Sequence, residues 1–231
     1  MIVSHKHKFI FLKTNKTAGT SIEIALSKFC GPDDIITPIS PVDEETRQAL
    51  GYRGPQHHLA PWYEYGVRDV VERVFKGKRR SRFYNHMTGR EVRDFVGPEV
   101  WNSYFKFCFE RNPYDRLISY YHWAHRSSPS RLPLSRFIRT SRAMMLKKRG
   151  YEVYTLDGKV AVDRICRFES IHEELEEVRR IIGLPEPLEL PHTKVRKRSD
   201  ARGYREVLGE EERDWVDRTF GDEMRLLGYH Y

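Results

Sequence analysis

The stretch from position 8 to position 30, KFIFLKTNKTAGTSIEIALSKFC, combines three patterns that decide how the chain folds. Its first six residues form a short apolar and aromatic run, which is typical of a core strand. From Gly19 onward, apolar side chains recur with helical spacing, and a Gly-Pro pair follows the stretch. The recurring side chains are Ile22, Leu26 and Phe29. Because a polar segment separates the two runs, the stretch predicts a strand, a loop and a helix in succession.

The polar loop has the composition of an anion-binding site. A loop between a strand and the N-terminus of a helix presents unpaired backbone N–H groups, and the helix dipole adds partial positive charge. Lys16 adds a full charge, while Gly19 lets the backbone approach a ligand closely. Three hydroxyl groups can donate to phosphate oxygens, those of Thr17, Thr20 and Ser21. A capped helix with a surface lysine is the alternative interpretation of the same residues.

The loop departs from the Walker A motif of ATPases and kinases. The pattern G-x-x-x-x-G-K-[ST] places its lysine directly after the second glycine, whereas Lys16 precedes Gly19. The sequence also offers no persuasive aspartate at the end of a predicted strand for the magnesium ion that phosphoryl transfer needs. Both departures disfavour an ordinary ATPase or kinase.

The same order of elements occurs a second time along the chain. YFKFCFE (104–110) has the aromatic alternation of a core strand, and RNPYDRLISYYHWAH (111–125) runs from a polar turn into a helix with Pro113 in its first turn. Strands that alternate with helices predict an α/β fold. We expect a three-layer, P-loop-like domain in which helices flank a central parallel sheet.

Local signals predict five further elements. These are a helix from about Thr88 to Val96, a hairpin centred on Asp157-Gly158, a short strand in RICRFES (164–170), a helix with a Ser170/Glu173 capping box and a stop at Gly183, and a helix from about Gly209.

The length of 231 residues fits a single domain that spans 1–231. Within it, residues 32–82 mix Pro, Gly and charge, so we expect a long insertion that carries substrate contacts or mobile loops, with 67–75 as its only helix. The insertion ends in the basic run KGKRRSR (76–82). This run either binds an anionic acceptor or only makes the chain more soluble.

Composition limits the partners and the compartment. Lys and Arg number 41 and Asp and Glu 33, so the net charge of +8 favours anionic partners such as nucleotides, nucleic acid or acidic glycans. The widely spaced Cys30, Cys108 and Cys166 predict reduced, buried thiols. No apolar stretch reaches the roughly 18–20 residues of a membrane span, and Met1 lies too close to the first strand for a signal peptide. We expect a cytoplasmic protein without stable membrane insertion.

Three segments taken together resemble a known enzyme family. KTAGTS follows the first strand, RNPYDRLISYY follows the second, and HMTGREVRDFVG lies just upstream of the second strand. In this order they are similar to the carbohydrate-type sulfotransferases (the Golgi-type and bacterial sulfotransferase family 2-like group), which use PAPS, 3′-phosphoadenosine 5′-phosphosulfate. The resemblance implies transfer of a sulfuryl group from PAPS to a hydroxyl of a carbohydrate or glycan-like, possibly anionic acceptor, with PAP as product and no metal ion.

The resemblance also implies roles for individual residues. The 5′-phosphosulfate loop would consist of Lys16, Thr17, Ala18, Gly19, Thr20 and Ser21. Lys16 would contact the bridging oxygen, and Arg111 and Ser119 would hold the 3′-phosphate. Two positions depart from the family: Asn15 replaces a frequent proline, and Glu110 replaces an apolar residue. A carboxylate at position 110 would repel the 3′-phosphate unless it points away.

His86, in the segment NHMT, falls at the family's position for the general base that deprotonates the acceptor hydroxyl. The adjacent pair His57-His58 is the rival for that role. The spacings of His5/His7 and His122/His125 could support a metal site, but no third ligand is apparent, and we expect none. Further candidates for nucleotide contacts are Arg167 in RFES and Lys194, Arg196 and Arg198 in the basic loop 194–202.

Two other functions are alternatives to sulfuryl transfer. A nucleic-acid-binding module could use the basic runs, but the aromatic residues fall in core patterns and do not alternate with the charges, so we expect no nucleic-acid partner. A nucleotide kinase of P-loop-like layout is the other alternative.

Overall fold

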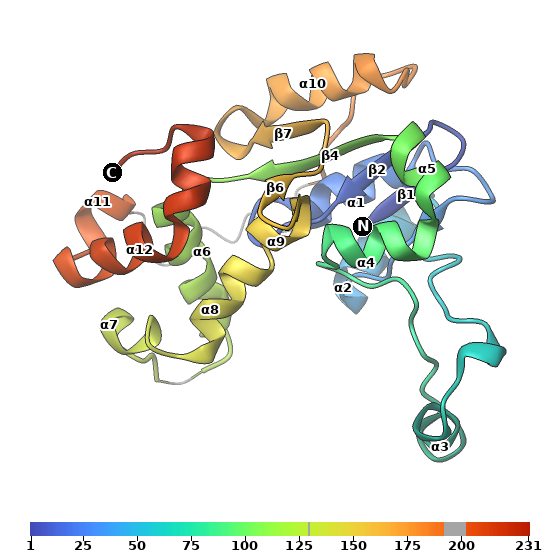
Figure 1. Ribbon diagram of the computed structural model, residues 1–231, viewed down its shortest axis with the longest axis horizontal. Helices are drawn as coiled ribbons and strands as arrows, with labels where there is room; N and C mark the ends of the chain where they lie inside the picture. Colours follow the sequence, from blue (N-terminus) through green and yellow to red (C-terminus); the bar gives the residue numbers. More distant parts are fainter. Residues whose placement is uncertain (129, 192–201) are drawn as a thin grey trace.

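The computed structural model describes residues 1–128, 130–191 and 202–231, which fold around a five-stranded sheet (Figure 1). The strands lie in the order β3-β1-β2-β4-β7, with the bounds β1 (Ile2–Ser4), β2 (Phe9–Leu12), β3 (Ile35–Ile36), β4 (Phe105–Glu110) and β7 (Arg164–Arg167). β2 and β7 both pair with β4 in parallel, whereas β1 runs antiparallel to β2 and β3. The predicted α/β class is confirmed, but the sheet is mostly and not wholly parallel, because β1 turns straight back into β2.

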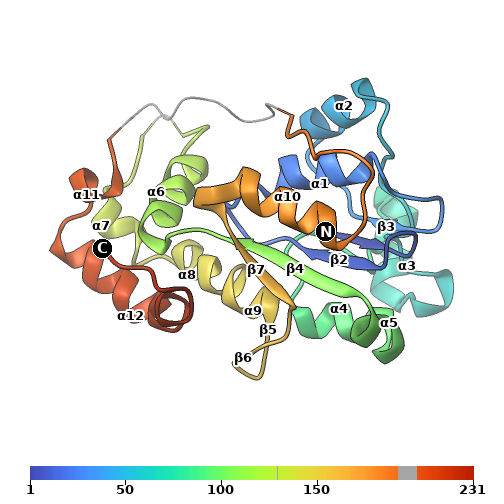
Figure 2. The ribbon, with the colours of Figure 1, turned by 90° about the horizontal axis from the view of Figure 1, so that it is seen from above.

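Helices cover both faces of the sheet and give the predicted three layers (Figure 2). Successive side chains of a strand point to opposite faces. Phe11 and Phe107 therefore pack with α1 (Gly19–Ser27) and α10 (Ile171–Ile181). Leu12 and Cys108 pack on the other face with α4 (Gly89–Val96), α5 (Pro98–Ser103) and α9 (Tyr151–Tyr154).

A third apolar cluster lies beyond the end of β4 and is built from helices and the turns beside them (Figure 1). It joins α6 (Pro113–Ala124), α7 (Leu134–Phe137), α8 (Ser141–Lys148), α11 (Tyr204–Val207) and α12 (Glu210–Leu227). Leu117, Leu146 and Phe220 are buried at its centre. The cluster holds α6, the helix that carries the second predicted anion loop at its start.

Most elements predicted from local signals are present. Thr88 and Glu91 form a capping box at the start of α4, and Asp157 and Gly158 adopt positive φ in the turn between β5 (Thr155–Leu156) and β6 (Lys159–Val160). The capping box predicted at Ser170 is wrong. Ser170 ends a short 3₁₀ turn, η2 (Phe168–Ser170), with ψ of 42°, and its side chain therefore makes no capping hydrogen bond.

The expectation that 67–75 is the only helix of segment 32–82 is wrong. α2 (Pro41–Ala49) begins with a proline at its first position, β3 pairs with β1 in the sheet, and η1 (Trp62–Glu64) precedes α3 (Val67–Lys76). The first part of the segment therefore completes the sheet and its helical layer, whereas α3 stands apart from the rest of the molecule (Figure 1).

The three cysteines are free and buried, as predicted. In residues 1–128, 130–191 and 202–231, no helix combines the length and the apolarity needed to cross a bilayer.

Candidate active site

The loop between β2 and α1 bends its backbone into a shape suited to an anion. Lys16 has a φ of 69° and Ala18 a φ of 59°, both in the left-handed region that residues other than glycine rarely adopt. Left-handed residues placed alternately along a loop turn successive N–H groups toward one point and form a nest for an anion. Ala18 is also the N-cap of α1 and makes no side-chain hydrogen bond to the helix. Two strained residues within three positions favour a functional role for the loop.

Lys13 ties this loop to α1 through a buried ion pair. Its Nζ lies 2.7 Å from Oε2 of Glu23, and both side chains are almost completely buried. Burial alone would raise the pKa of Glu23, but Lys13 and the neighbouring cations outweigh it and lower the pKa to about 2. A Cβ atom at position 19 would stand 2.8 Å from Cγ of Lys13. Gly19 is therefore required where the lysine side chain passes beneath the loop.

His86 contacts the same loop in a fixed orientation. Its Nδ1 lies 2.8 Å from the carbonyl oxygen of Lys13. Because a carbonyl only accepts hydrogen bonds, Nδ1 carries the hydrogen and Nε2 keeps its lone pair. Burial, together with the charges of Lys13 and Arg149, lowers the pKa of His86 to about 3. The imidazole is therefore neutral at physiological pH and in the tautomer that a base requires.

Arg111 connects the second predicted anion loop to the first. Its Nη1 donates to the carbonyl oxygen of Lys16 at 3.3 Å, and its Nε donates to Asp115 at 2.6 Å. The guanidinium carbon also lies 4.2 Å from the ring centroid of Phe168. These three contacts hold the guanidinium between the β2–α1 loop, the first turn of α6 and the segment after β7.

One face of α6 is turned toward the β2–α1 loop. Asp115, Ser119 and Trp123 are spaced by four residues and therefore share a face of the helix. The first of them holds Arg111, and Nζ of Lys16 lies 5.7 Å from the ring centroid of Trp123. Ser119 thus lies between the two contacts, as a site made from both loops requires.

The side chain of Glu110 is buried in the core, where its carboxylate accepts a hydrogen bond from the backbone N–H of Arg111 at 3.2 Å. Its side chain forms an ion pair with Arg116, which also pairs with Glu223 at 2.6 Å, and all three side chains are at most 2 % exposed. Burial and the charge of Glu223 raise the pKa of Glu110 to about 8, against the opposing effect of Arg116. Burial and the ion pair with Arg116 therefore weaken the conflict that the sequence indicated between Glu110 and the predicted 3′-phosphate.

The remaining predicted residues lie in different surroundings. The hydroxyl of Thr17 is buried and 2.8 Å from that of Thr14, and Thr20 and Ser21 lie in the first turn of α1. Arg167 donates to the carbonyl oxygen of Leu227 at 2.6 Å, at the end of α12. Lys194, Arg196 and Arg198 lie outside the described residues. The nucleotide contacts of these side chains stay predictions.

The rival histidines make contacts of their own. Nε2 of His57 lies 2.9 Å from the carbonyl oxygen of Pro32, and burial lowers the pKa of His58. His5 contacts the hydroxyl of Tyr104. Within the described ranges, no three His, Cys, Asp or Glu side chains come together as a metal-binding group.

Four side chains of this region were not predicted from the sequence: Lys13, Asp115, Trp123 and Phe168. A signal existed for two of them, since Asp115 lies four residues after Arg111 and Trp123 four residues after Ser119. Nothing in the sequence marks Phe168 as the partner of Arg111. The two residues follow the ends of β4 and β7, which are neighbours only in the folded sheet.

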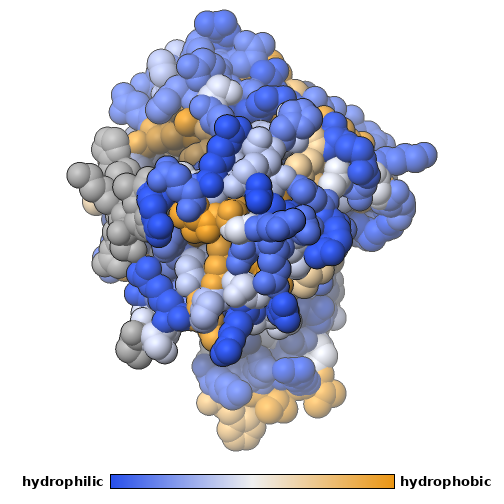
Figure 3. Space-filling model, turned by 90° about the vertical axis from the view of Figure 1, so that its left-hand side faces the viewer, coloured by the Kyte–Doolittle hydropathy of each residue, from blue (hydrophilic) through white to orange (hydrophobic). Residues whose placement is uncertain are grey.

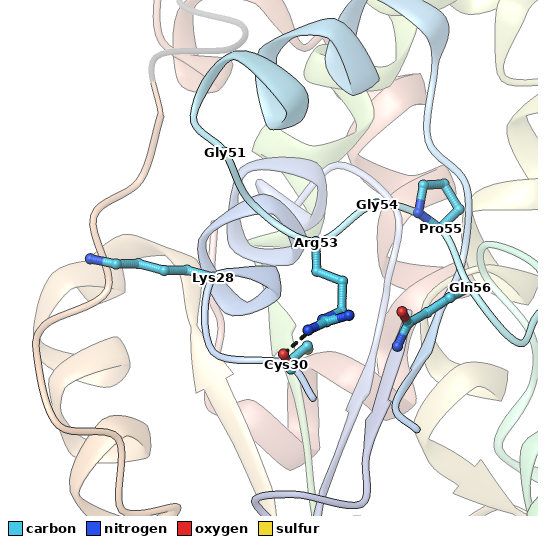
Figure 4. Close-up of a pocket in the computed structure, with 7 residues that line it drawn as sticks. All are labelled: Lys28, Cys30, Gly51, Arg53, Gly54, Pro55 and Gln56. Carbon is cyan, nitrogen blue, oxygen red and sulfur yellow. Dashed lines mark hydrogen bonds between the residues drawn. The ribbon is translucent and has the colours of Figure 1, made fainter. Parts of the chain in front are cut away.

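A cavity of about 480 Å³ lies at the opposite end of α1 from the loop (Figure 4). Lys28, one of its lining residues, pairs with Glu186 at 3.0 Å, and two other lining side chains donate to backbone carbonyls. Arg53 donates to the carbonyl oxygen of Cys30 at 2.9 Å, and Gln56 donates to that of Gly31 at 2.8 Å. Residues other than glycine adopt a left-handed backbone in the β2–α1 loop and not in the cavity lining, so that loop remains the candidate site.

Comparison with known proteins gives three matches. The family model described as "Sulfotransferase family" matches residues 1–230. An uncharacterized protein of Archaeoglobus fulgidus is 30% identical over 121 residues, which cover 51% of this chain and 96% of that protein. A crystal structure of a sulfotransferase from Alicyclobacillus acidocaldarius is 17% identical, with a TM-score of 0.44 over 96% of each chain.

The low pKa of His86 predicts a loss of stability in mild acid. The unfolded chain has a histidine pKa near 6.5 and the folded chain one of about 3, so the unfolded state binds more protons between these values. Stability should therefore fall as the pH drops below 6.5. Between pH 7 and pH 5, wild type should lose about 2 kcal/mol more than His86→Asn in urea unfolding.

His57→Asn is the matched control, because His57 also has a left-handed backbone but is exposed. It should keep the pH dependence of the wild type. Equal pH slopes in the wild type and His86→Asn would show that His86 titrates normally and is not held neutral.

Proposed function

We propose that this chain, which belongs to the sulfotransferase family, transfers a sulfuryl group from PAPS to a hydroxyl of a carbohydrate or glycan-like acceptor. The observation that carries the proposal is the left-handed backbone at Lys16 and Ala18, joined by Arg111 to the start of α6. Family membership favours sulfuryl transfer over the kinase and nucleic-acid alternatives.

The two loops fit a ligand with phosphate groups at two positions. The nest and the N-terminus of α1 would hold the 5′-phosphosulfate, with Lys16 beside it. Arg111 and Ser119 would hold the 3′-phosphate, and the Arg111–Phe168 contact keeps the guanidinium in place. When bound, PAPS supplies the sulfuryl group and leaves as PAP. No metal ion enters this scheme.

His86 is proposed as the general base. Its Nε2 would accept the proton of the acceptor hydroxyl while Nδ1 continues to donate to the carbonyl oxygen of Lys13. A pKa of about 3 is low for a base, but the negative charge of a bound nucleotide would raise it toward the working pH. The same anion thus prepares the residue that acts on the acceptor.

Lys16 is proposed to stabilise the negative charge that develops on the leaving phosphate. Its ammonium group lies beside Trp123, next to the nest, and its own backbone carbonyl is held by Arg111. Lys16 would therefore contribute twice to the site: its side chain would neutralise the leaving phosphate, and its left-handed backbone forms part of the nest.

PAP should bind without magnesium and should raise the melting temperature by mass action. Arg111→Ala should weaken PAP binding roughly 10- to 100-fold, the worth of one charge-assisted contact of about 1.5–3 kcal/mol. Isothermal calorimetry measures the two affinities, and a thermal melt measures the stabilisation. Arg90→Ala, which removes a surface guanidinium paired with Asp157, is the control and should leave PAP affinity unchanged. Stabilisation by ATP with magnesium but not by PAP would replace this proposal with the kinase.

His86→Asn should lower turnover by about 10²- to 10⁴-fold and leave PAP affinity nearly intact, because the base acts in the chemical step. Asparagine tolerates the left-handed backbone at this position. Sulfuryl transfer from PAPS to a panel of glycans measures the effect. His57→Ala and His58→Ala serve as controls. Turnover that survives in His86→Asn but collapses in His58→Ala would identify His58 as the base.

A further inference from the structure

The segment 62–82, here called the arm, projects from the molecule (Figure 1). It exposes apolar side chains. In α3 they recur at helical spacing and form one stripe, which two aromatic residues of η1 precede. The exposed side chains are Trp62, Tyr63, Val67, Val70, Val71, Val74 and Phe75. Trp62 and Phe75 are more than 80% exposed. Apolar atoms gather at the lower tip of the molecule in the space-filling view (Figure 3).

The polar face of α3 is the one that packs against the chain. Asp69 pairs with Arg80 at 3.0 Å, and Glu72 pairs with Lys78 at 3.3 Å. Lys78 and Arg80 both belong to the part of the arm that follows α3. An isolated surface helix normally buries its apolar stripe and leaves its charges in water. In the arm the ion pairs fix the opposite orientation, so the stripe faces outward.

The arm also carries excess positive charge around that stripe. It contains seven Lys and Arg residues and three Asp and Glu residues, a balance of 7 − 3 = +4. Arg73, Lys76 and Arg79 are exposed and form no ion pair with any residue of the described ranges. A partner that covers the apolar stripe and neutralises the basic residues of the arm must therefore be both apolar and anionic.

We propose that the arm docks the protein on the surface of an anionic lipid bilayer. Valine and phenylalanine would enter the boundary between headgroups and acyl chains, Trp62 and Tyr63 would lie at the headgroup level, and the unpaired basic residues would contact anionic headgroups. A second copy of the arm is a poor occupant of the stripe, because two segments of charge +4 repel each other.

The base of the arm leads to the candidate active site. The backbone N–H of Phe83, just after the arm, donates to the carbonyl oxygen of His58 at 3.0 Å, and His86 follows three residues later. His86 is therefore only four residues along the chain from the end of the arm that would dock on the lipid surface. The docking itself does not depend on the proposed sulfuryl transfer.

Flotation with vesicles tests the proposal on the full chain. Wild type should float with phosphatidylcholine vesicles that contain about 30% phosphatidylserine and should stay in solution with phosphatidylcholine alone. Val74→Ser/Phe75→Ser should weaken binding about tenfold or more through lost apolar burial. Arg73→Gln/Lys76→Gln/Arg79→Gln should weaken it on the order of 100-fold, and about 0.5 M salt should have a similar effect.

Val42→Ser and Lys159→Gln are matched controls, since they alter an exposed valine and an exposed lysine outside the arm. Both should float like the wild type. PAP affinity without vesicles should be equal in all variants, so this test is independent of the nucleotide site. The proposal is overturned if wild type does not float, if the arm variants float as well as the controls, or if Phe75→Ser abolishes self-association of a protein that ignores vesicles.

Discussion

The buried ion pair between Lys13 and Glu23 is the interaction on which the site depends. A buried carboxylate is tolerable only when cations and hydrogen bonds compensate its charge. Glu23 receives the ammonium of Lys13 at 2.7 Å and the hydroxyl of Thr37 at 2.9 Å, and a guanidinium nitrogen of Arg47 lies 3.6 Å away. One carboxylate thus binds together the end of β2, α1, the segment after β3 and α2.

The backbone that this pair holds in place is also the meeting point of later segments of the chain. The carbonyl oxygen of Lys13 accepts from His86, and that of Lys16 accepts from Arg111. The N–H of Asn15 donates to the carbonyl oxygen of Arg149 at 2.8 Å. Each partner comes from a different part of the sequence. The left-handed residues of the loop are strained, and these contacts keep them in that conformation before any ligand arrives.

The sequence predicted those parts of the molecule whose cause is local. The strand, loop and helix of 8–30 follow from periodicity and glycine, and Thr88 and Asp157-Gly158 act within their own turns. The strand β1 was not predicted, because its three residues, two of them apolar, are too few to show a period. The role of Lys13 was also not predicted. A lysine before a loop resembles surface charge, and only the fold shows that Glu23 lies beneath it. The inward direction of Glu110 likewise depends on Arg116 and Glu223, which the sequence does not place.

The proposed function requires that the β2–α1 loop and the start of α6 form one nucleotide site. Titration of ¹⁵N-labelled protein with PAP, followed by backbone amide NMR shifts, tests it most directly. A single nucleotide site should give saturable shifts with one affinity at residues 16–21, at Arg111 and at Ser119, with small changes around the cavity at Arg53 and Gln56. Shifts that centre on Arg53 and Gln56, or no shifts at residues 16–21, would contradict it.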